Sequence, residues 1–441
     1  MKKAFIVLWV LLLWFLAVAG RFIRSGGRDV PPPDVADFQA EKRPDVRPED
    51  NAYDHFLAAA KQVVNPDDFP AVAGFLAGKP AELTEIRECL AKNEACLARL
   101  RQGTECAIYQ ALARDPEMKD EPFSSWISMA KAATLAVRLA QVEGRYPEAV
   151  SGTALELRFG SLVQNDAEGL LPYLVGISIL NSGLERAQEL ARDPALPAEL
   201  QRQLAGLLAA LPAPNAGLER ALRWEYRFGE WAVERVMEDV LMRGGQRLRP
   251  QALRNYFMKR ARRSNRFFQP NRTRQELADF YRGMIRNVPK SRADMVFPEV
   301  REWEPSIRDF LRPNVGGRMF MVILEPSMSR MFDNMCYACG ELAGVQLVLA
   351  CRRFRQDRGP WPETLAELVP EYLAAVPADP FDGRPFRYSA EKAIVWSVGK
   401  NLTDENGSTG LLDDNCKRKG GLANFHAEDM VFELQPARAE E

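Results

Sequence analysis

The chain has 441 residues, of which 46% are apolar and 27% charged, which allows two or three globular domains with ample core. Its 59 Lys and Arg nearly balance its 60 Asp and Glu, so the overall charge excludes a strongly basic chain and gives no reason to expect nucleic acid as a partner. Seven cysteines, an odd number at spacings that repeat no zinc-ribbon pattern, define no disulfide framework.

Residues 1–24 predict an N-terminal transmembrane anchor or a signal peptide. Lys2 and Lys3 precede an uncharged run of 17 residues, from Ala4 to Gly20, which Arg21 closes. That length reaches the lower limit for spanning a hydrocarbon core of ~30 Å and exceeds the usual signal-peptide core. The pattern favours a retained anchor over a cleaved signal, and in both cases the bulk of the chain is exported.

Two segments follow the anchor. Residues 25–50 contain "VPPPD" and "KRPDVRPED" and few large apolar side chains, which is typical of a semi-rigid Pro-rich linker. Residues 51–245 place apolar side chains at three- and four-residue spacings, which predicts a helical region. Within it, Gly144 ends one expected helix and Pro147 lies in the first turn of the next, as in a helical hairpin.

Residues 246–316 form an expected basic helical connector. The stretch 243–275 carries eleven Lys or Arg and no acid, with Tyr256, Phe257, Phe267 and Phe268 interleaved. Such a surface could bind anionic lipid headgroups or nucleic acid, although export would remove most nucleic acid as a partner. The alternative, which we favour, is a solvated helix whose aromatic side chains pack inward while its arginines pair with acids elsewhere in the chain.

Residues 317–441 predict a small α+β module. A long helix ends at Gly359 and Pro360, and the runs "FRYSA", "AIVWSV" and "DMVFEL" read as short antiparallel strands. Between them each proline lies at a boundary, where its fixed φ and missing N–H cost little. The predicted fold class is therefore mainly α, with a helical-hairpin region followed by a long helix and a small antiparallel sheet.

The module resembles the periplasmic part of the type II secretion major pseudopilin. The resemblance covers about the last quarter of the chain and consists of a helix end, a proline corner and a strand end: Gly359 to Pro362, then Leu373, Pro377, Asp379, Pro380, Phe381, Gly383, Pro385 and Tyr388, then Ser397 and Gly399. Upstream pieces such as "NAYDHFLAAA", "QPNRT" and "PNVGGRMF" look like a group of uncharacterised membrane-anchored bacterial proteins that end in this module.

The sequence also departs from that family. "AVAGRFIRSGG" lacks the glutamate that follows a prepilin cleavage site, and its apolar run precedes the glycine. Nearly 300 residues separate the anchor from the module, so a filament subunit is not expected. The resemblance implies a bacterial inner-membrane protein with its bulk in the periplasm. The core of the module is expected to bury a helix face together with five side chains: Trp361, Leu368, Leu373, Phe386 and Trp396.

Two groups of residues are candidates for chemistry or for metal binding. Cys336 and Cys339 form a C-x-x-C in the middle of the long helix, where packing in the core is favoured over redox chemistry. The loop after Gly399 gathers oxygen ligands, and the resemblance implies a Ca²⁺ site there, with Asn401, Asp404, Asp413 and Asp414 as candidate ligands. The pattern favours a solvated acidic loop, free of the core, over the metal site.

No Ser-His-Asp, two-His or phosphate-binding pattern is present, so we predict no enzyme and no resident cofactor beyond that candidate calcium. The sequence indicates a membrane-anchored extracytoplasmic scaffold that contacts other envelope proteins. Two alternatives are an exported thiol oxidoreductase or hydrolase, and an accessory protein of a type II secretion-like system. A broad apolar groove between helices would favour the scaffold, and a pocket of converging acids the enzyme.

Overall fold

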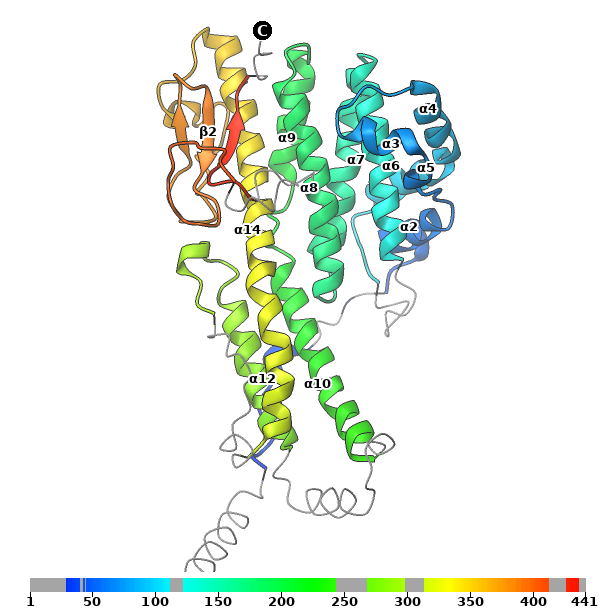
Figure 1. The fold of residues 1–441 in the computed structure, drawn as a ribbon, viewed down its shortest axis with the longest axis vertical. Coiled ribbons are helices and arrows are strands. Elements are labelled where there is room, and N and C mark those ends of the chain that lie inside the picture. Colours follow the sequence, from blue (N-terminus) through cyan, green and yellow to red (C-terminus); the bar gives the residue numbers. More distant parts are fainter. Residues whose placement is uncertain are drawn as a thin grey trace, which may run out of the picture. The chain divides into compact units, whose positions relative to one another are not determined.

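The computed structural model describes residues 29–39, 43, 45–111, 122–242, 268–297, 313–411 and 426–435. The protein is mainly helical with a small antiparallel sheet, which confirms the predicted fold class (Figure 1). Internal contacts divide the chain into two compact units. Unit 1 comprises Met1–Glu41, Arg223–Ile285 and Val296–Arg330, and unit 2 comprises Lys42–Leu222, Arg286–Met295 and Met331–Glu441. The boundaries that the sequence predicts between the anchor, the linker, the helical region, the basic connector and the C-terminal module stay predictions.

The α-helices are α2 (Ala52–Ala60), α3 (Pro70–Leu76), α4 (Leu83–Lys92), α5 (Glu94–Glu105), α6 (Phe123–Val142), α7 (Tyr146–Asn165), α8 (Leu170–Arg192), α9 (Ala198–Ala210), α10 (Leu218–Met242), α12 (Pro270–Ile285) and α14 (Val315–Arg358). Short 3₁₀ helices are η1 (Ala36–Phe38), η2 (Pro48–Asp50), η3 (Pro66–Asp68), η4 (Arg292–Asp294) and η5 (Leu365–Leu368). The strands are β1 (Arg387–Ser389), β2 (Ile394–Ser397) and β3 (Met430–Glu433).

In unit 2, α6, α7 and α8 pack side by side, with α2 to α5 against α6 and α7 (Figure 1). Gly144, at φ 70°, separates α6 from α7, and Pro147 lies in the first turn of α7, as the sequence predicted. Trp126 and Phe159 are fully buried in the main aromatic cluster of this region. The helical part is therefore held by apolar side chains packed at helical spacing.

Two glycines let α7 and α8 approach closely. A Cβ on Gly160 would lie 2.4 Å from the backbone nitrogen of Leu180, and one on Gly176 would lie 2.4 Å from that of Gln164. Real side chains do not tolerate such distances, so the two backbones touch only because both positions lack a Cβ.

The C-terminal sheet of unit 2 has the strand order β1-β2-β3, with both pairs antiparallel. One face lies against α14, because a Cβ on Gly344 of that helix would meet the ring of Phe432 at 2.3 Å. The opposite face carries a small apolar cluster formed by Ile394, Trp396 and Val431. Successive side chains of a strand point to opposite faces, so the sheet has two apolar faces to cover.

The prediction of which side chains form the core of this module is correct only in part. Leu368 and Phe386 are buried, whereas Trp361 and Leu373 are half-buried. Trp396 is buried with the cluster on the face away from α14. The loop after Gly399, expected to be free of the core, instead covers that cluster: a Cβ on Gly407 would lie 2.4 Å from Ile394 Cδ1. The second apolar face explains this fold of the loop, since it must be shielded from water.

Unit 1 contains most of α10, α12 and the first turns of α14, together with the described N-terminal residues. Phe38 is buried and stacks on Tyr226 of α10, with ring centroids 4.0 Å apart. Arg282 of α12 holds Asp37, with a distance of 2.8 Å between Nε and Oδ2. These contacts fix part of the segment that the sequence marked as a linker.

Asp29 supplies a further contact of that segment. Its carboxylate accepts hydrogen bonds from the backbone nitrogens of Asn271 at 2.8 Å and Arg272 at 3.1 Å, in the first turn of α12. An acid at this place satisfies donors that no helical carbonyl reaches and complements the helix dipole. Residues 29–39 are therefore bound to α10 and α12 rather than extended between parts of the chain.

Among the described residues, the part of α14 from Met328 to Arg358 is long and apolar enough to cross a bilayer, with a mean hydropathy of 1.2. Within it, 83% of the most apolar stretch is buried inside the protein, as in the core helix of a globular fold. The run Ala4–Gly20, for which the sequence predicts the anchor, lies outside the described residues.

Candidate functional site

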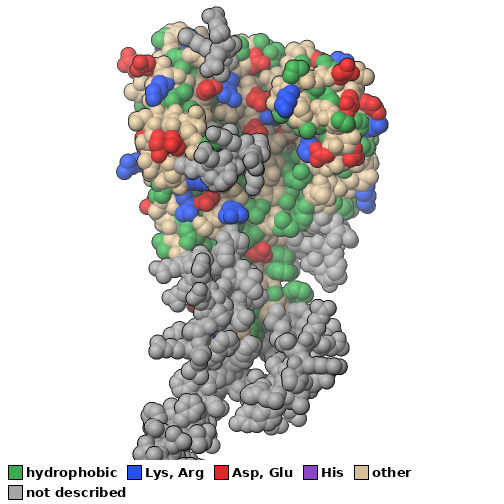
Figure 2. Space-filling model, in the orientation of Figure 1, with side chains coloured by type: hydrophobic (Ala, Val, Ile, Leu, Met, Phe, Trp, Pro, Cys, Tyr) green, Lys and Arg blue, Asp and Glu red, His purple; other side chains and the backbone are tan. Residues whose placement is uncertain are grey.

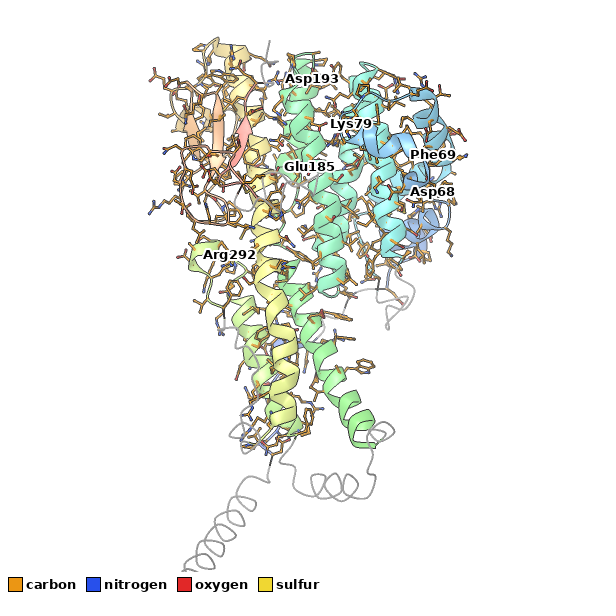
Figure 3. All side chains as sticks on the ribbon, in the orientation of Figure 1. Asp68, Phe69, Lys79, Glu185, Asp193 and Arg292 are labelled. Carbon is orange, nitrogen blue, oxygen red and sulfur yellow. The ribbon has the colours of Figure 1, made fainter. Side chains whose placement is uncertain are left out.

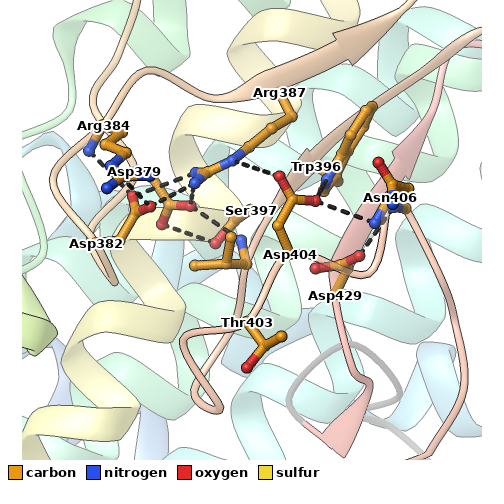
Figure 4. A network of polar contacts seen from close by, with 12 residues as sticks. Asp379, Asp382, Arg384, Arg387, Trp396, Ser397, Thr403, Asp404, Asn406 and Asp429 are labelled. Atoms are coloured by element: carbon orange, nitrogen blue, oxygen red, sulfur yellow. Dashed lines mark hydrogen bonds and ion pairs between the residues drawn. The ribbon is translucent and has the colours of Figure 1, made fainter.

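A buried carboxylate organises the proline corner of the C-terminal module (Figure 4). Asp379 is fully buried and accepts hydrogen bonds from Ser397 Oγ at 2.8 Å, the Val398 backbone nitrogen at 3.0 Å and the Phe381 backbone nitrogen at 2.9 Å. Burial raises the pKa of the Asp379 carboxyl, and these donors act against that rise. The corner and the end of β2 are thus joined through one side chain.

Arg387 of β1 connects this carboxylate to two others. Its guanidinium contacts Asp379 at 2.9 Å, forms a close ion pair with Asp382, and reaches Asp404 at 3.4 Å. Hydrogen bonding to Asp382 raises the pKa of Arg387. In this network one guanidinium links three carboxylates, so it ties the proline corner, β1 and the loop after Gly399 together.

The network gives a physical reason for the motif quoted from the sequence. Ser397 donates to Asp379 and accepts from the backbone nitrogen of Gly399 at 3.2 Å, so the strand-end motif is bonded directly to the proline corner. Gly399 itself has φ 63°, a conformation that favours glycine. Sequence reasoning identified these positions but missed Arg387, because an arginine in a short strand carries no signal of its own.

Two of the four candidate calcium ligands lie within the described residues, and they already have protein partners. Asp404 Oδ1 accepts from Trp396 Nε1 and from the backbone nitrogen of Asn406, both at 3.0 Å. Asn401 Oδ1 accepts from the backbone nitrogen of Thr403 at 3.2 Å, and the Asn401 amide nitrogen donates to Glu405 at 2.9 Å. These contacts use the oxygens a metal would need, so Asn401 and Asp404 do not fit a calcium site as they stand.

Asp413 and Asp414 lie outside the described residues, and the described residues hold no group of three His, Cys, Asp or Glu side chains arranged for a metal. Calcium binding therefore stays a prediction from the resemblance. Sequence reasoning also missed Asp429, a fully buried acid whose Oδ2 accepts from the backbone nitrogens of Gly407 and Ser408, at 2.8 and 3.1 Å.

The C-x-x-C pair lies in the middle of α14, far from the helix N-terminus at Val315. Cys336 is buried and Cys339 is half-buried, and the six described cysteines form no disulfide. Burial raises the pKa of Cys339 to about 12 and also raises that of Cys336. Since the thiolate is the reactive form, these thiols have the properties of core side chains and not of a redox centre.

A groove in the helical part of unit 2 is the other candidate site. It has a volume of about 590 Å³ and lies between α4–α5 and α6–α7. It is lined by small or aliphatic side chains, among them Ala91, Ala98, Ala133, Ala136, Val137, Ala140 and Gly152. Its rim carries both signs of charge: Glu94, Arg101, Arg145 and Glu148. The volume is within the range of about 300–1,000 Å³ typical of binding pockets.

Charge elsewhere is dispersed. On the face shown in Figure 2, Lys and Arg alternate with Asp and Glu among the described residues, without a large patch of one sign. Most of the basic stretch 243–275 lies outside the described residues; within it, Arg274 pairs with Glu230 of α10 at 3.6 Å. Binding of anionic lipid at this stretch stays a prediction.

Comparison with known proteins adds no further constraint. No protein-family model, curated protein or solved structure matches the chain. Function is therefore inferred from the geometry of the C-terminal network and of the helical groove.

Proposed function

We propose that this chain is a membrane-anchored extracytoplasmic interaction protein whose helical part binds an apolar segment of another envelope protein. The observation that carries the proposal is the groove between α4–α5 and α6–α7. Because small side chains line it, the groove has room for the apolar side chains of a bound helix or extended segment.

The exposure of the groove residues also supports binding of an apolar segment. Ala136 and Gly152, which line the groove, are half-buried, and Ala91 and Ala98 on the opposite wall are exposed. Covering these apolar surfaces with a partner lowers the free energy of the system. The charges of both signs at the rim suit a partner that carries both signs as well. The redox alternative has less support, since both thiols of the C-x-x-C pair are kept protonated by burial.

The predicted anchor is consistent with this role. Asp29, which caps α12, follows Gly20 by nine residues, and an extended chain of that length spans about 30 Å. If Ala4–Gly20 is retained in the bilayer, unit 1 is held within that distance of the membrane surface. Location in the inner membrane of a bacterium, with the bulk of the chain in the periplasm, is part of the proposal.

The test is to fill the groove. Ala136→Trp should remove the space for a bound segment, whereas Ala209→Trp places the same ring on an exposed position of α9. Full-length protein is extracted from its own membranes in mild detergent, and the size of its native complex is compared. We expect A136W to lose the complex with its partner and therefore to run at a smaller native size, whereas A209W should keep the size of the unchanged chain. Equal sizes in both variants, with melting temperatures unchanged, would contradict the proposal.

A further inference from the structure

Three aromatic side chains, Trp224, Phe228 and Trp231, form a stripe on the outer face of α10. Trp224 stacks on Phe228, with ring centroids 5.6 Å apart and an interplanar angle of 10°. Phe228 stacks in turn on Trp231, with centroids 5.5 Å apart and an angle of 28°. Their spacing of four and then three residues places the rings on one helix face. Phe228 is 50% exposed, Trp231 is 53% exposed, and Trp224 is half-buried. These three residues are the aromatic stripe.

The opposite face of α10 belongs to the core of unit 1. Tyr226 and Val233 are fully buried, and Tyr226 meets Tyr281 of α12 edge to face, with ring centroids 6.4 Å apart. A Cβ on Gly229 would lie 2.9 Å from Cδ2 of Leu277, so the two helices are in contact there. Figure 3 shows side chains that project from α10 on the side away from α12. The aromatic stripe is therefore not part of this core.

The composition of the stripe suits a membrane interface. Single exposed apolar residues are common on protein surfaces, whereas adjoining ones mark a place of contact. Tryptophan combines a large apolar ring with an N–H donor, and for this reason it is enriched where lipid headgroups meet acyl chains. Arg227 is exposed and lies beside the stripe, three residues after Trp224 and four before Trp231. Its guanidinium suits the phosphate of a lipid headgroup.

The predicted anchor brings the aromatic stripe within reach of a bilayer. The apolar run ends nine residues before Asp29, which bonds the first turn of α12, and an extended chain of that length spans about 30 Å. In the next turn of α12, Arg274 pairs with Glu230 of α10 at 3.6 Å. Glu230 precedes Trp231 in the chain, so the segment from the anchor joins unit 1 at the level of the stripe.

The sequence that follows α10 has the charge that an anionic lipid surface attracts. α10 ends at Met242, and residues 243–275 carry eleven Lys or Arg and no acid. Basic segments next to a membrane are drawn to anionic headgroups. Exposed Trp and Phe together with Lys and Arg are typical of helices that lie on a membrane surface. A lipid surface therefore explains both the rings and the neighbouring charge.

We propose that the aromatic stripe binds a lipid surface and lies in the headgroup region of the bilayer that holds the predicted anchor. The three rings enter the boundary between headgroups and acyl chains, and Arg227 contacts lipid phosphate. The inference rests on the membrane location in the proposed function and not on the groove, which belongs to unit 2. Unit 1 is then attached to the membrane at two points, the anchor and α10, which restricts how it can turn on its linker.

The test measures tryptophan fluorescence of the full-length chain in nanodiscs of phosphatidylcholine and phosphatidylglycerol. Lipids with acyl chains brominated near the headgroup quench the tryptophans that they contact. Trp224→Phe/Trp231→Phe keeps the aromatic rings but removes two reporters, and the other two expected in lipid are Trp9 and Trp14 of the predicted anchor. The quenched fluorescence should therefore fall by about half in W224F/W231F. Trp126→Phe removes a fully buried reporter that no lipid can contact, so it should leave the quenched fluorescence unchanged.

A second pair of variants tests insertion of the stripe. Phe228→Glu places a carboxylate between the two tryptophans, where an anionic lipid surface repels it, so quenching should fall toward the level of W224F/W231F. Ile127→Glu, at an exposed apolar position of α6, is the matched control and should leave quenching as it is in the unchanged chain. If F228E behaves like I127E, the stripe is not inserted and the inference is wrong.

The remaining outcomes separate this inference from the proposed function. A chain that enters nanodiscs but shows equal quenching in W224F/W231F would overturn the inference and leave partner binding at the groove intact. Stripe tryptophans that are shielded from acrylamide in water but are not quenched by brominated lipid would show that a protein, such as a second copy of this chain, covers the stripe. That result would overturn the inference as well. A chain that does not enter nanodiscs would overturn both the inference and the proposed membrane location.

Discussion

The helical part of unit 2 (residues 52–210) and its sheet module (residues 359–435) are stabilised in different ways. The helical part relies on apolar clusters and on close backbone contact at Gly160 and Gly176. The module has short strands and relies on a buried network in which Arg387 meets three carboxylates. A small sheet that cannot bury enough apolar area needs such specific polar contacts to fix its loops.

This difference explains where each part can accommodate function. In the helical part, small side chains leave an apolar groove without weakening the core beneath it. In the module, the charged residues that look suited to chemistry are engaged with one another. We therefore propose partner binding on the helices and a structural role for the network, and the following changes test this division.

The largest effect is expected from Asp379→Ala. The change leaves Arg387 without a buried partner and removes the bond to Ser397, so it should lower the free energy of unfolding by about 3–5 kcal/mol. Glu371→Ala breaks an exposed pair with Arg358 and should cost less than about 1 kcal/mol. Chemical denaturation of both variants measures the difference, and equal costs would show that the network is dispensable.

A pair of glycine substitutions tests the helical part. Gly176→Ala forces a Cβ to within 2.4 Å of the Gln164 nitrogen, so we expect a loss of about 1–3 kcal/mol or more from overpacking. Gly206→Ala in α9 meets nothing within 4 Å and should stabilise by about 0.5–1 kcal/mol through helix propensity. Thermal melts that show the same sign for both would refute the close approach of α7 and α8.

Glu156 of α7 predicts a pH-dependent effect. Burial raises the pKa of this carboxyl from 4.5 to about 8, so between these values the unfolded state has released a proton that the folded state keeps. Stability should therefore fall as pH rises from about 5 to 8. Glu156→Gln removes this loss: we expect a melting temperature a few degrees above that of the unchanged chain at pH 8 and little difference at pH 4.5. A constant difference across this range would contradict the buried acid.

Calcium should have the smallest effect. Because Asp404 is bonded to Trp396 and Arg387, we expect the melting temperature of the full chain to be the same in calcium and in chelator. A calcium-dependent rise that disappears in Asp413→Asn/Asp414→Asn would instead establish the metal site implied by the resemblance, with ligands other than Asp404.

The sequence predicted the elements better than their contacts. Helical periodicity and the Gly144–Pro147 turn located α6 and α7, and alternation located all three strands, because these signals are local. The face that Trp396 occupies depends on what covers each side of the sheet, which periodicity does not specify. The groove was not predicted either, since it combines residues from several helices that are separated in the chain.

The central claim, that the helical groove and not the sheet module contacts a partner, is tested most directly by photo-crosslinking in cells. A photoreactive amino acid is placed at Ala98 in the groove wall or at Ala390, an exposed turn of the module. We predict an adduct of one defined mass from position 98 that disappears when Ala136→Trp is added, and no comparable adduct from position 390. An adduct from position 390 alone, or one from position 98 that persists in A136W, would contradict the account.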